Sequence, residues 1–149
     1  MSVHIDDLAG LVGKDLGGSD WIVVSQERIG VFADATDDHQ WIHVDEEQAA
    51  RGPFGTTVAH GYLTLSLFIP LFSGLLDVTG VTTKVNYGLN KVRFPAPVPA
   101  GSRIRLTATI AGVEEVAGDA AQVTLDGVIE IEDKAKPACV LQSVLRFYR

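Results

Sequence analysis

The second half of the chain alternates regularly between apolar and polar positions. Apolar residues recur at positions 104, 106, 108 and 110, with polar residues at 103, 105, 107 and 109 between them, and a similar pattern runs from 122 to 131. This period of two is typical of strands that bury one face. Turn-forming residues at 112–119 and 132–137 separate these stretches from each other and from a final strand at 138–148. Three long antiparallel strands are therefore predicted, preceded by another over 82–94 that is broken near Gly88.

The stretch from Thr57 to Leu75 predicts one long helix that is buried on nearly every side. Its apolar residues are Val58, Leu63, Leu65, Leu67, Phe68, Leu71, Phe72 and Leu75. A helix that is apolar all round is normally enclosed by the rest of its domain. Pro70 should bend this helix or occupy a position where a missing amide donor is tolerated.

Shorter elements are predicted before this helix. A β-prone run covers 21–24, and Ser25 is a suitable N-cap for a helix from Gln26 to about Thr36. Asp45 followed by Gln48 indicates a second, short helix through Ala50, which the Gly-Pro-Phe-Gly segment ends. Residues 37–43 have no period and are predicted to form a loop.

The order of these elements indicates an α+β fold, in which an antiparallel sheet curls around a central apolar helix. The length of 149 residues suits one domain, spanning 1–149, and the chain has no internal repeat, low-complexity tract or linker.

Composition narrows the possible partners. The net charge of -7 would repel a phosphate backbone, so nucleic acid is not an expected partner. A local group of cations could still meet a phosphorylated small molecule; it comprises Lys84, Lys91, Arg93, Arg103 and Arg105.

The cellular setting is predicted to be the cytoplasm. The single Cys139 has no partner for an intramolecular disulfide and lies in a predicted buried strand. Charged residues interrupt the N-terminal region where a secretory signal would be apolar, and the apolar run 63–76 is too short to span a bilayer. A soluble protein without membrane contact is therefore expected.

Two clusters could carry chemistry. Asp38 and His43 share the loop, where a carboxylate and an imidazole could hold one water and move its protons; alternatively, Asp38 is a cap and His43 a surface residue. His60 and Gly61 lie in the first turn of the long helix, where free amides and the helix dipole could stabilise an oxyanion. The alternative is that Gly61 permits close helix packing and His60 is a hydrogen-bonded structural residue.

Other chemistries lack their usual sequence patterns. His39, His43 and His60 lie near several aspartates, but no zinc-binding spacing occurs, so no metal is predicted. The serines lack a G-x-S-x-G setting, and no glycine pattern for a nucleotide cofactor exists. Catalysis without a cofactor is expected.

The strand over 86–95 combines polar donors with a glycine, which can mark a bulge or close approach of a ligand or another chain. An edge strand ending at the proline-rich turn 95–99 explains the same residues equally well.

The two clusters together resemble the motifs of the MaoC-like dehydratases, the (R)-specific enoyl-CoA hydratases of hot-dog fold. The matching segments are Phe32-Ala-Asp-Ala-Thr-Asp-Asp-His-Gln-Trp-Ile-His43 and Ala59-His-Gly-Tyr-Leu63, and the segment Asn86 to Phe94 resembles the nodulation protein N-like branch. The chain departs from the hydratase motif at three positions: Asp37 replaces Gly, Gln40 replaces Asn and Trp41 replaces Pro.

The resemblance implies a function and a site. Asp38 and His43 would hold a water that adds to C3 of a trans-2-enoyl thioester, and the Gly61 amide would bind the thioester carbonyl. The acyl chain would lie in an apolar tunnel lined partly by Leu63 and Phe68. The full set of substrate-binding residues implied is His60, Tyr62, Leu63, Asn86, Tyr87 and Arg93. The partners implied are an acyl-CoA or acyl carrier protein thioester and a second copy of the chain in a homodimer.

Two other functions fit the same residues. The altered loop 37–41 is compatible with a non-catalytic hot-dog module that binds acyl thioesters or stabilises a partner subunit. A hot-dog thioesterase would release free CoA, but the spacing of Asp38 and His43 resembles the hydratase motif instead.

Overall fold

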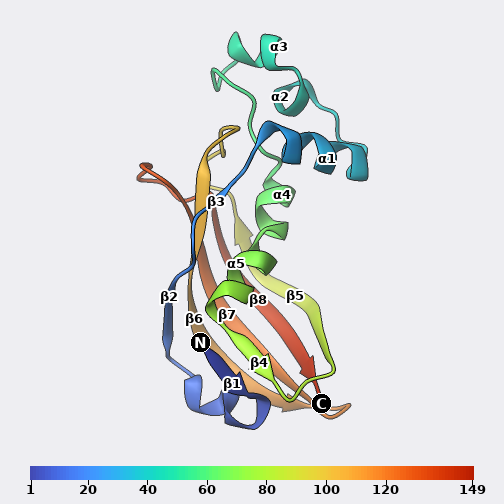
Figure 1. The fold of residues 1–149 in the computed structure, drawn as a ribbon, viewed down its shortest axis with the longest axis vertical. Helices are drawn as coiled ribbons and strands as arrows, with labels where there is room; N and C mark the ends of the chain where they lie inside the picture. Colours follow the sequence, from blue (N-terminus) through green and yellow to red (C-terminus); the bar gives the residue numbers. More distant parts are fainter.

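The centre of the protein is a curved antiparallel sheet that encloses two apolar helices (Figure 1). This computed structural model describes all residues from 1 to 149. The strands of the sheet are β2 (Asp15–Gly18), β3 (Ile22–Val23), β5 (Thr83–Arg93), β6 (Arg103–Val116), β7 (Ala120–Ile131) and β8 (Cys139–Tyr148). Their order is β2-β6-β7-β8-β5, and β3 also pairs with β6. The three successive strands predicted from the alternating pattern are confirmed as β6, β7 and β8.

Two details of the strands refine the prediction. The turn expected from residue 112 begins later, because a register shift between Ile110 and Gly112 lets β6 continue against β7 to Val116. The interruption predicted near Gly88 is confirmed as a register shift between Asn86 and Gly88, where β5 pairs with β8. A bulge thus absorbs an extra residue in each strand without ending it.

The single long helix predicted from Thr57 is wrong: the segment contains two short helices, α4 (Gly61–Ser66) and α5 (Phe68–Leu75). Pro70 has no N–H to donate to the carbonyl of Ser66, so the hydrogen-bond ladder cannot run through this point. The break falls at Leu67, and Pro70 lies in the first turn of α5, where a missing donor is tolerated. Residues 57–60 are not helical, and Val58 forms a β-bridge with Pro99.

The core lies between α5 and the inner face of the sheet. Phe68, Leu71, Phe72 and Leu75 of α5 are buried and belong to one cluster with the inward-facing residues of β6, β7 and β8. The α+β arrangement of a sheet wrapped around an apolar helix is therefore confirmed, with that helix in two pieces. No helix in the structure is both long enough and apolar enough to cross a lipid bilayer.

Three further helices gather at one end of the sheet, namely α1 (Gln26–Thr36), α2 (Trp41–Val44) and α3 (Glu46–Ala50) (Figure 1). At the other end, β1 (Ser2–His4) pairs in parallel with β4 (Asp77–Thr79), and the 3-10 helix η1 (Ile5–Leu11) follows β1. The sequence patterns did not predict this second end.

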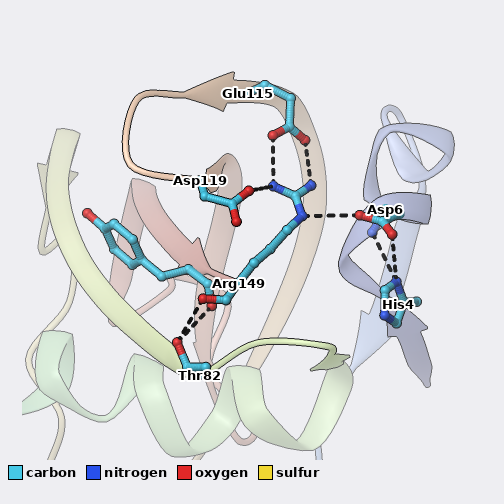
Figure 2. A network of polar contacts seen from close by, with 7 residues as sticks. His4, Asp6, Thr82, Glu115, Asp119 and Arg149 are labelled. Carbon is cyan, nitrogen blue, oxygen red and sulfur yellow. Dashed lines mark hydrogen bonds and ion pairs between the residues drawn. The ribbon is translucent and has the colours of Figure 1, made fainter.

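The C-terminal residue, Arg149, contacts several segments at this second end (Figure 2). The guanidinium of Arg149 contacts Asp6 of η1 at 3.1 Å, Glu115 of β6 at 3.0 Å and Asp119 of the β6–β7 turn at 3.2 Å. Its main-chain carbonyl accepts a hydrogen bond from the hydroxyl of Thr82. One side chain thus joins the N-terminal segment to the β6–β7 hairpin.

Candidate functional site

The candidate site forms where α1, α2 and the start of α4 meet. The predicted bounds of α1 are confirmed: Ser25 caps it, and the helix ends at Asp37, which has a left-handed backbone with φ 56°. Residues 37–43 are not all loop as predicted, because His43 lies in α2, a single helical turn. The predicted cap of α3 is confirmed, since a carboxylate oxygen of Asp45 accepts from the Gln48 amide at 2.9 Å.

The imidazole of His43 is buried and held in one orientation. Its Nδ1 lies 2.6 Å from the carbonyl oxygen of Val58, and because a carbonyl can only accept, Nδ1 carries the proton. In the neutral ring, Nε2 is then left as an acceptor. The main-chain carbonyl of His43 accepts from Gln26 Nε2 at 2.8 Å, and the hydroxyl of Thr57 donates to Oε1 of the same glutamine.

His60 lies directly against this ring. The ring centroids of His43 and His60 are 3.8 Å apart with an interplanar angle of 24°, and Phe32 contacts His60 with centroids 4.8 Å apart. Nε2 of His60 lies 2.9 Å from the main-chain carbonyl oxygen of Asp38. Nδ1 of His60 is buried and has no hydrogen-bond partner.

The side chain of Asp38 completes the cluster. A carboxylate oxygen of Asp38 and a ring nitrogen from each of His43 and His60 lie within 4.8 Å of one another. Such a group could hold a metal ion by proximity.

Burial lowers the pKa of His43 from its usual value. Desolvation is the largest cause, and the neighbouring His60 acts in the same direction. The hydrogen bond to Val58 and the charge of Asp38 oppose the shift but do not cancel it. The neutral imidazole, which can accept a proton at Nε2, is therefore favoured.

A mainly apolar cavity of about 340 Å³ borders both His43 and Gly61, and it is also lined by Phe54, Thr64, Phe94 and Pro97. Gly61 is the first residue of α4, and its amide N–H makes no hydrogen bond within the chain. A Cβ at this position would lie 3.1 Å from Phe94 Cδ2. The cavity thus brings together the His43 ring, a free amide donor and an apolar space; the Asp38 side chain does not line it but lies within 4.8 Å of the histidine rings.

A larger hollow, of about 600 Å³, lies on the face of the sheet opposite α5. Three of its polar side chains hydrogen-bond to one another, because Asn90 donates to Gln142 and Gln142 donates to Asp126, both at 2.7 Å. The smaller cavity is lined by Gly61, whose amide N–H is free, and by His43, whose Nε2 is free. We therefore place the site at the smaller cavity.

None of the six predicted substrate-binding residues lines this cavity, although His60 packs against His43 and Arg93 precedes Phe94. Tyr62 is exposed beside Phe94, with ring centroids 6.4 Å apart, whereas Leu63 is buried in the core and does not line the cavity. Asn86 lines a separate slot of about 250 Å³ with Phe68 and Ile69. The ring of Tyr87 lies against the Arg146 guanidinium, 3.4 Å from it, on the outer side of the sheet. Within one chain, therefore, no single tunnel lined by both Leu63 and Phe68 reaches the cavity.

Most of the predicted group of cations is already paired. Lys84 pairs with Asp77, Arg103 with Glu132 and Arg105 with Glu130. Lys91 and Arg93 form no ion pair; Arg93 ends β5, next to Phe94 of the cavity. These two cations are the ones left to bind an anion.

Comparison with known proteins identifies the family. A family model described as MaoC like domain matches residues 7–131. The chain belongs to the MaoC-like family. It is 53% identical over 143 residues to 3-hydroxyacyl-thioester dehydratase Z of Mycobacterium tuberculosis, covering 96% of this chain and 95% of that protein. It is also 44% identical over 138 residues to nodulation protein N of Rhizobium leguminosarum bv. viciae, covering 91% of this chain and 86% of that protein.

A solved structure confirms the fold. The (R)-hydratase from A. caviae involved in PHA biosynthesis superposes with a TM-score of 0.70 at 22% identity, covering 90% of this chain and 94% of that one. The predicted hot-dog fold and the predicted resemblance to the nodulation protein N-like branch are both confirmed.

Several residues that shape this MaoC-like site were missed by sequence reasoning. Gln26 and Thr57 hold the main chain of His43, and Phe94 packs against Gly61. Gln26 and Thr57 come from segments far apart in the chain and belong to no local motif, and although Phe94 ends the segment that resembles nodulation protein N, nothing in that segment indicated its contact with Gly61. The one sequence signal was the position of Gln26 directly after the N-cap residue Ser25, and it could have suggested that the Gln26 side chain contacts a neighbouring segment.

Proposed function

We propose that the protein is a hydro-lyase that interconverts a trans-2-enoyl thioester and an (R)-3-hydroxyacyl thioester, acting as an (R)-specific enoyl-CoA hydratase. The observation that carries the proposal is the approach of the Asp38 carboxylate to the ring of His43, which has Nε2 free to accept a proton. The 53% identity to a protein named 3-hydroxyacyl-thioester dehydratase supports this reaction class. The R configuration rests on the family resemblance.

In the hydration direction, Asp38 and His43 would hold one water molecule between the carboxylate and Nε2. The water oxygen would bond to C3 of the enoyl thioester while one of its protons passes to this pair, and a proton from the pair would be delivered to C2. Dehydration is the reverse, in which the proton leaves C2 and the hydroxyl leaves C3 as water. The atoms balance without a metal ion or a covalent enzyme intermediate.

The Gly61 amide would bind the thioester carbonyl as it becomes enolate-like. A free N–H that already points at the developing charge requires no reorganisation during the reaction. The lack of a side chain at Gly61 lets Phe94 pack against the backbone and keeps the amide uncovered by a Cβ. The apolar walls of the cavity would strengthen this hydrogen bond by excluding water.

The thioester carrier would extend toward the end of β5. Arg93 has no acidic partner, so it could contact phosphates of CoA or of an acyl carrier protein without first breaking an ion pair. Arg93 directly precedes Phe94 of the cavity, whereas Lys91 lines the hollow on the other face of the sheet.

A homodimer would complete the site. β5 is the outer strand of the sheet, and all its residues are exposed except Val92, which is half-buried. Val85 and Leu89 of this edge are 39% and 44% exposed, and Ile69 of α5 is 38% exposed. A long unpaired edge with apolar side chains is a natural place for a second chain to pair. Pairing there would also bring a second copy to the slot that Asn86 lines.

Hydration of crotonyl-CoA, followed by the loss of enoyl thioester absorbance, tests the proposed reaction. Asp38→Asn and His43→Gln should each lower kcat by at least about a hundredfold. Asp34→Asn and His39→Gln are matched controls, because these two residues form an exposed pair with each other and should retain wild-type rates. Chiral analysis of the product should give the R enantiomer.

Two further measurements, together with the rates of the variants, separate the alternatives. Calorimetric binding of an acyl-CoA without turnover would favour the non-catalytic module, and release of free thiol would favour a thioesterase. Wild-type rates in both site variants would show that Asp38 and His43 are not the catalytic pair.

A further inference from the structure

His60 touches both members of the proposed acid–base pair. Its Nε2 bonds to the main chain of Asp38 at 2.9 Å, and its ring lies on the ring of His43 with centroids 3.8 Å apart. His60 itself is only 3% exposed, so it is a buried part of the framework around the cavity. It does not line the cavity bordered by His43 and Gly61.

The hydrogen bonds of His60 fix its tautomer. The Asp38 carbonyl can only accept, so Nε2 of His60 must carry the proton, and Nδ1 has a lone pair with no donor near it. A second proton on Nδ1 would be a buried donor without an acceptor, and it would put a positive charge against the His43 ring. The ring of His60 is therefore unsuited to transferring protons itself.

Asp38 has few other restraints. It follows the left-handed residue Asp37, its side chain is exposed, and its carboxylate makes only a long contact of 3.5 Å with the Gln40 amide. Its own amide donates to the Ala33 carbonyl at 3.2 Å. The His60 bond is thus the contact that ties the Asp38 carbonyl to the ring beside it.

We propose that His60 is a positioning residue, which holds Asp38 through Nε2 and His43 through ring stacking so that both groups meet the same water. This assigns His60 a role different from the substrate contact expected from the sequence. The inference rests on the proposed function for its kinetic consequences. Its structural part, the link between the ring and the loop over 37–41, stands independently.

Two substitutions separate the two contacts. His60→Gln places an amide nitrogen close to the position of Nε2 and so can still donate to Asp38, but it removes the ring. His60→Phe retains an aromatic ring against His43 and removes the donor. We expect His60→Phe to lower kcat about tenfold to a hundredfold, with KM within about twofold of wild type, and His60→Gln to recover part of the loss.

A second measurement does not depend on activity. Hydrogen exchange of the amides in segment 37–41 should be faster in His60→Phe than in wild type and closer to wild type in His60→Gln. Nitrogen chemical shifts of the wild-type protein at neutral pH should show His60 protonated at Nε2. Thermal unfolding of both variants checks that each is folded.

The outcomes separate this inference from the proposed function. If wild type does not hydrate crotonyl-CoA, the proposed function fails, while exchange and nitrogen shifts still decide whether His60 anchors the loop. An unchanged kcat in His60→Phe, or a raised KM with unchanged kcat, would overturn the positioning role. Protonation of His60 at Nδ1 in place of Nε2, or unchanged exchange in segment 37–41, would overturn the structural link.

Discussion

The backbone of Gly61 lies against the ring of Phe94, so closely that a Cβ at position 61 would lie 3.1 Å from Phe94 Cδ2. Gly61→Ala should therefore displace the ring or fill the space before the free amide. We expect a fall in kcat/KM for crotonyl-CoA of at least about tenfold, because the carbonyl could no longer reach the N–H in the same geometry. Steady-state kinetics measures this effect.

Gly74→Ala provides the matched control. A Cβ there would meet nothing within 4 Å, and Gly74 lies inside α5. Alanine is favoured over glycine by about 0.5–1 kcal/mol in a helix interior and by less at this penultimate position of α5, so the variant should retain full activity and be no less stable than wild type. Equal losses of activity in the two variants would indicate a general effect of added volume.

The lowered pKa of His43 predicts where the rate falls on the acid side of the pH–rate profile. Because burial moves this pKa below the usual value of about 6.5, the neutral ring persists to lower pH than it does in an unfolded chain. The value of kcat/KM for hydration should remain high at pH 6.5 and fall only below it. A limb centred above pH 6.5 in the kcat/KM profile would contradict this assignment.

The same shift links stability to pH. The unfolded chain binds a proton at His43 more readily than the folded chain does, so folding is most favoured above about pH 6.5. Stability from this group should be lost as pH falls from 6.5 through the lowered folded pKa. Chemical denaturation of wild type and His43→Gln across this range should show a difference in pH slope between them.

Cys139 should be inert while the protein is folded. Its side chain is 0% exposed at the start of β8, and desolvation raises the pKa of its thiol to about 11. A thiol reagent that needs the thiolate should therefore react with the denatured protein and not with the native one. Rapid labelling of the native protein would show that β8 opens at this end.

Arg149 should stabilise the end of the sheet in a way that depends on salt and acid. Its hydrogen bond holds the pKa of Glu115 below the usual range, so the stabilisation is present above that range and is lost as pH falls through the lowered value. Arg149→Gln should lower the melting temperature at neutral pH (Figure 2). The difference from wild type should shrink in acid and at high salt. Lys136→Gln is a suitable control, because Lys136 takes part in none of the ion pairs.

Local chemistry made part of the fold predictable. The inward positions of β6 and β7 could be assigned because alternation with period two leaves one face buried. Ser25 and Asp45 marked the starts of α1 and α3, since capping depends on neighbouring residues alone. The break at Leu67 was missed, because the buried pattern continues through Pro70 even where the helix cannot.

The sequence by itself determined the sheet, the caps and the candidacy of Asp38, His43 and Gly61, because periodicity and motif spacing are properties of adjacent residues. Only the tertiary structure decided that His60 stacks on His43, that Val58 fixes the His43 proton, and that Phe94 lies against Gly61. It also moved Tyr87 to the outer side of the sheet. Contacts between distant segments depend on how the sheet curves around the two helices, and no local pattern encodes that curvature.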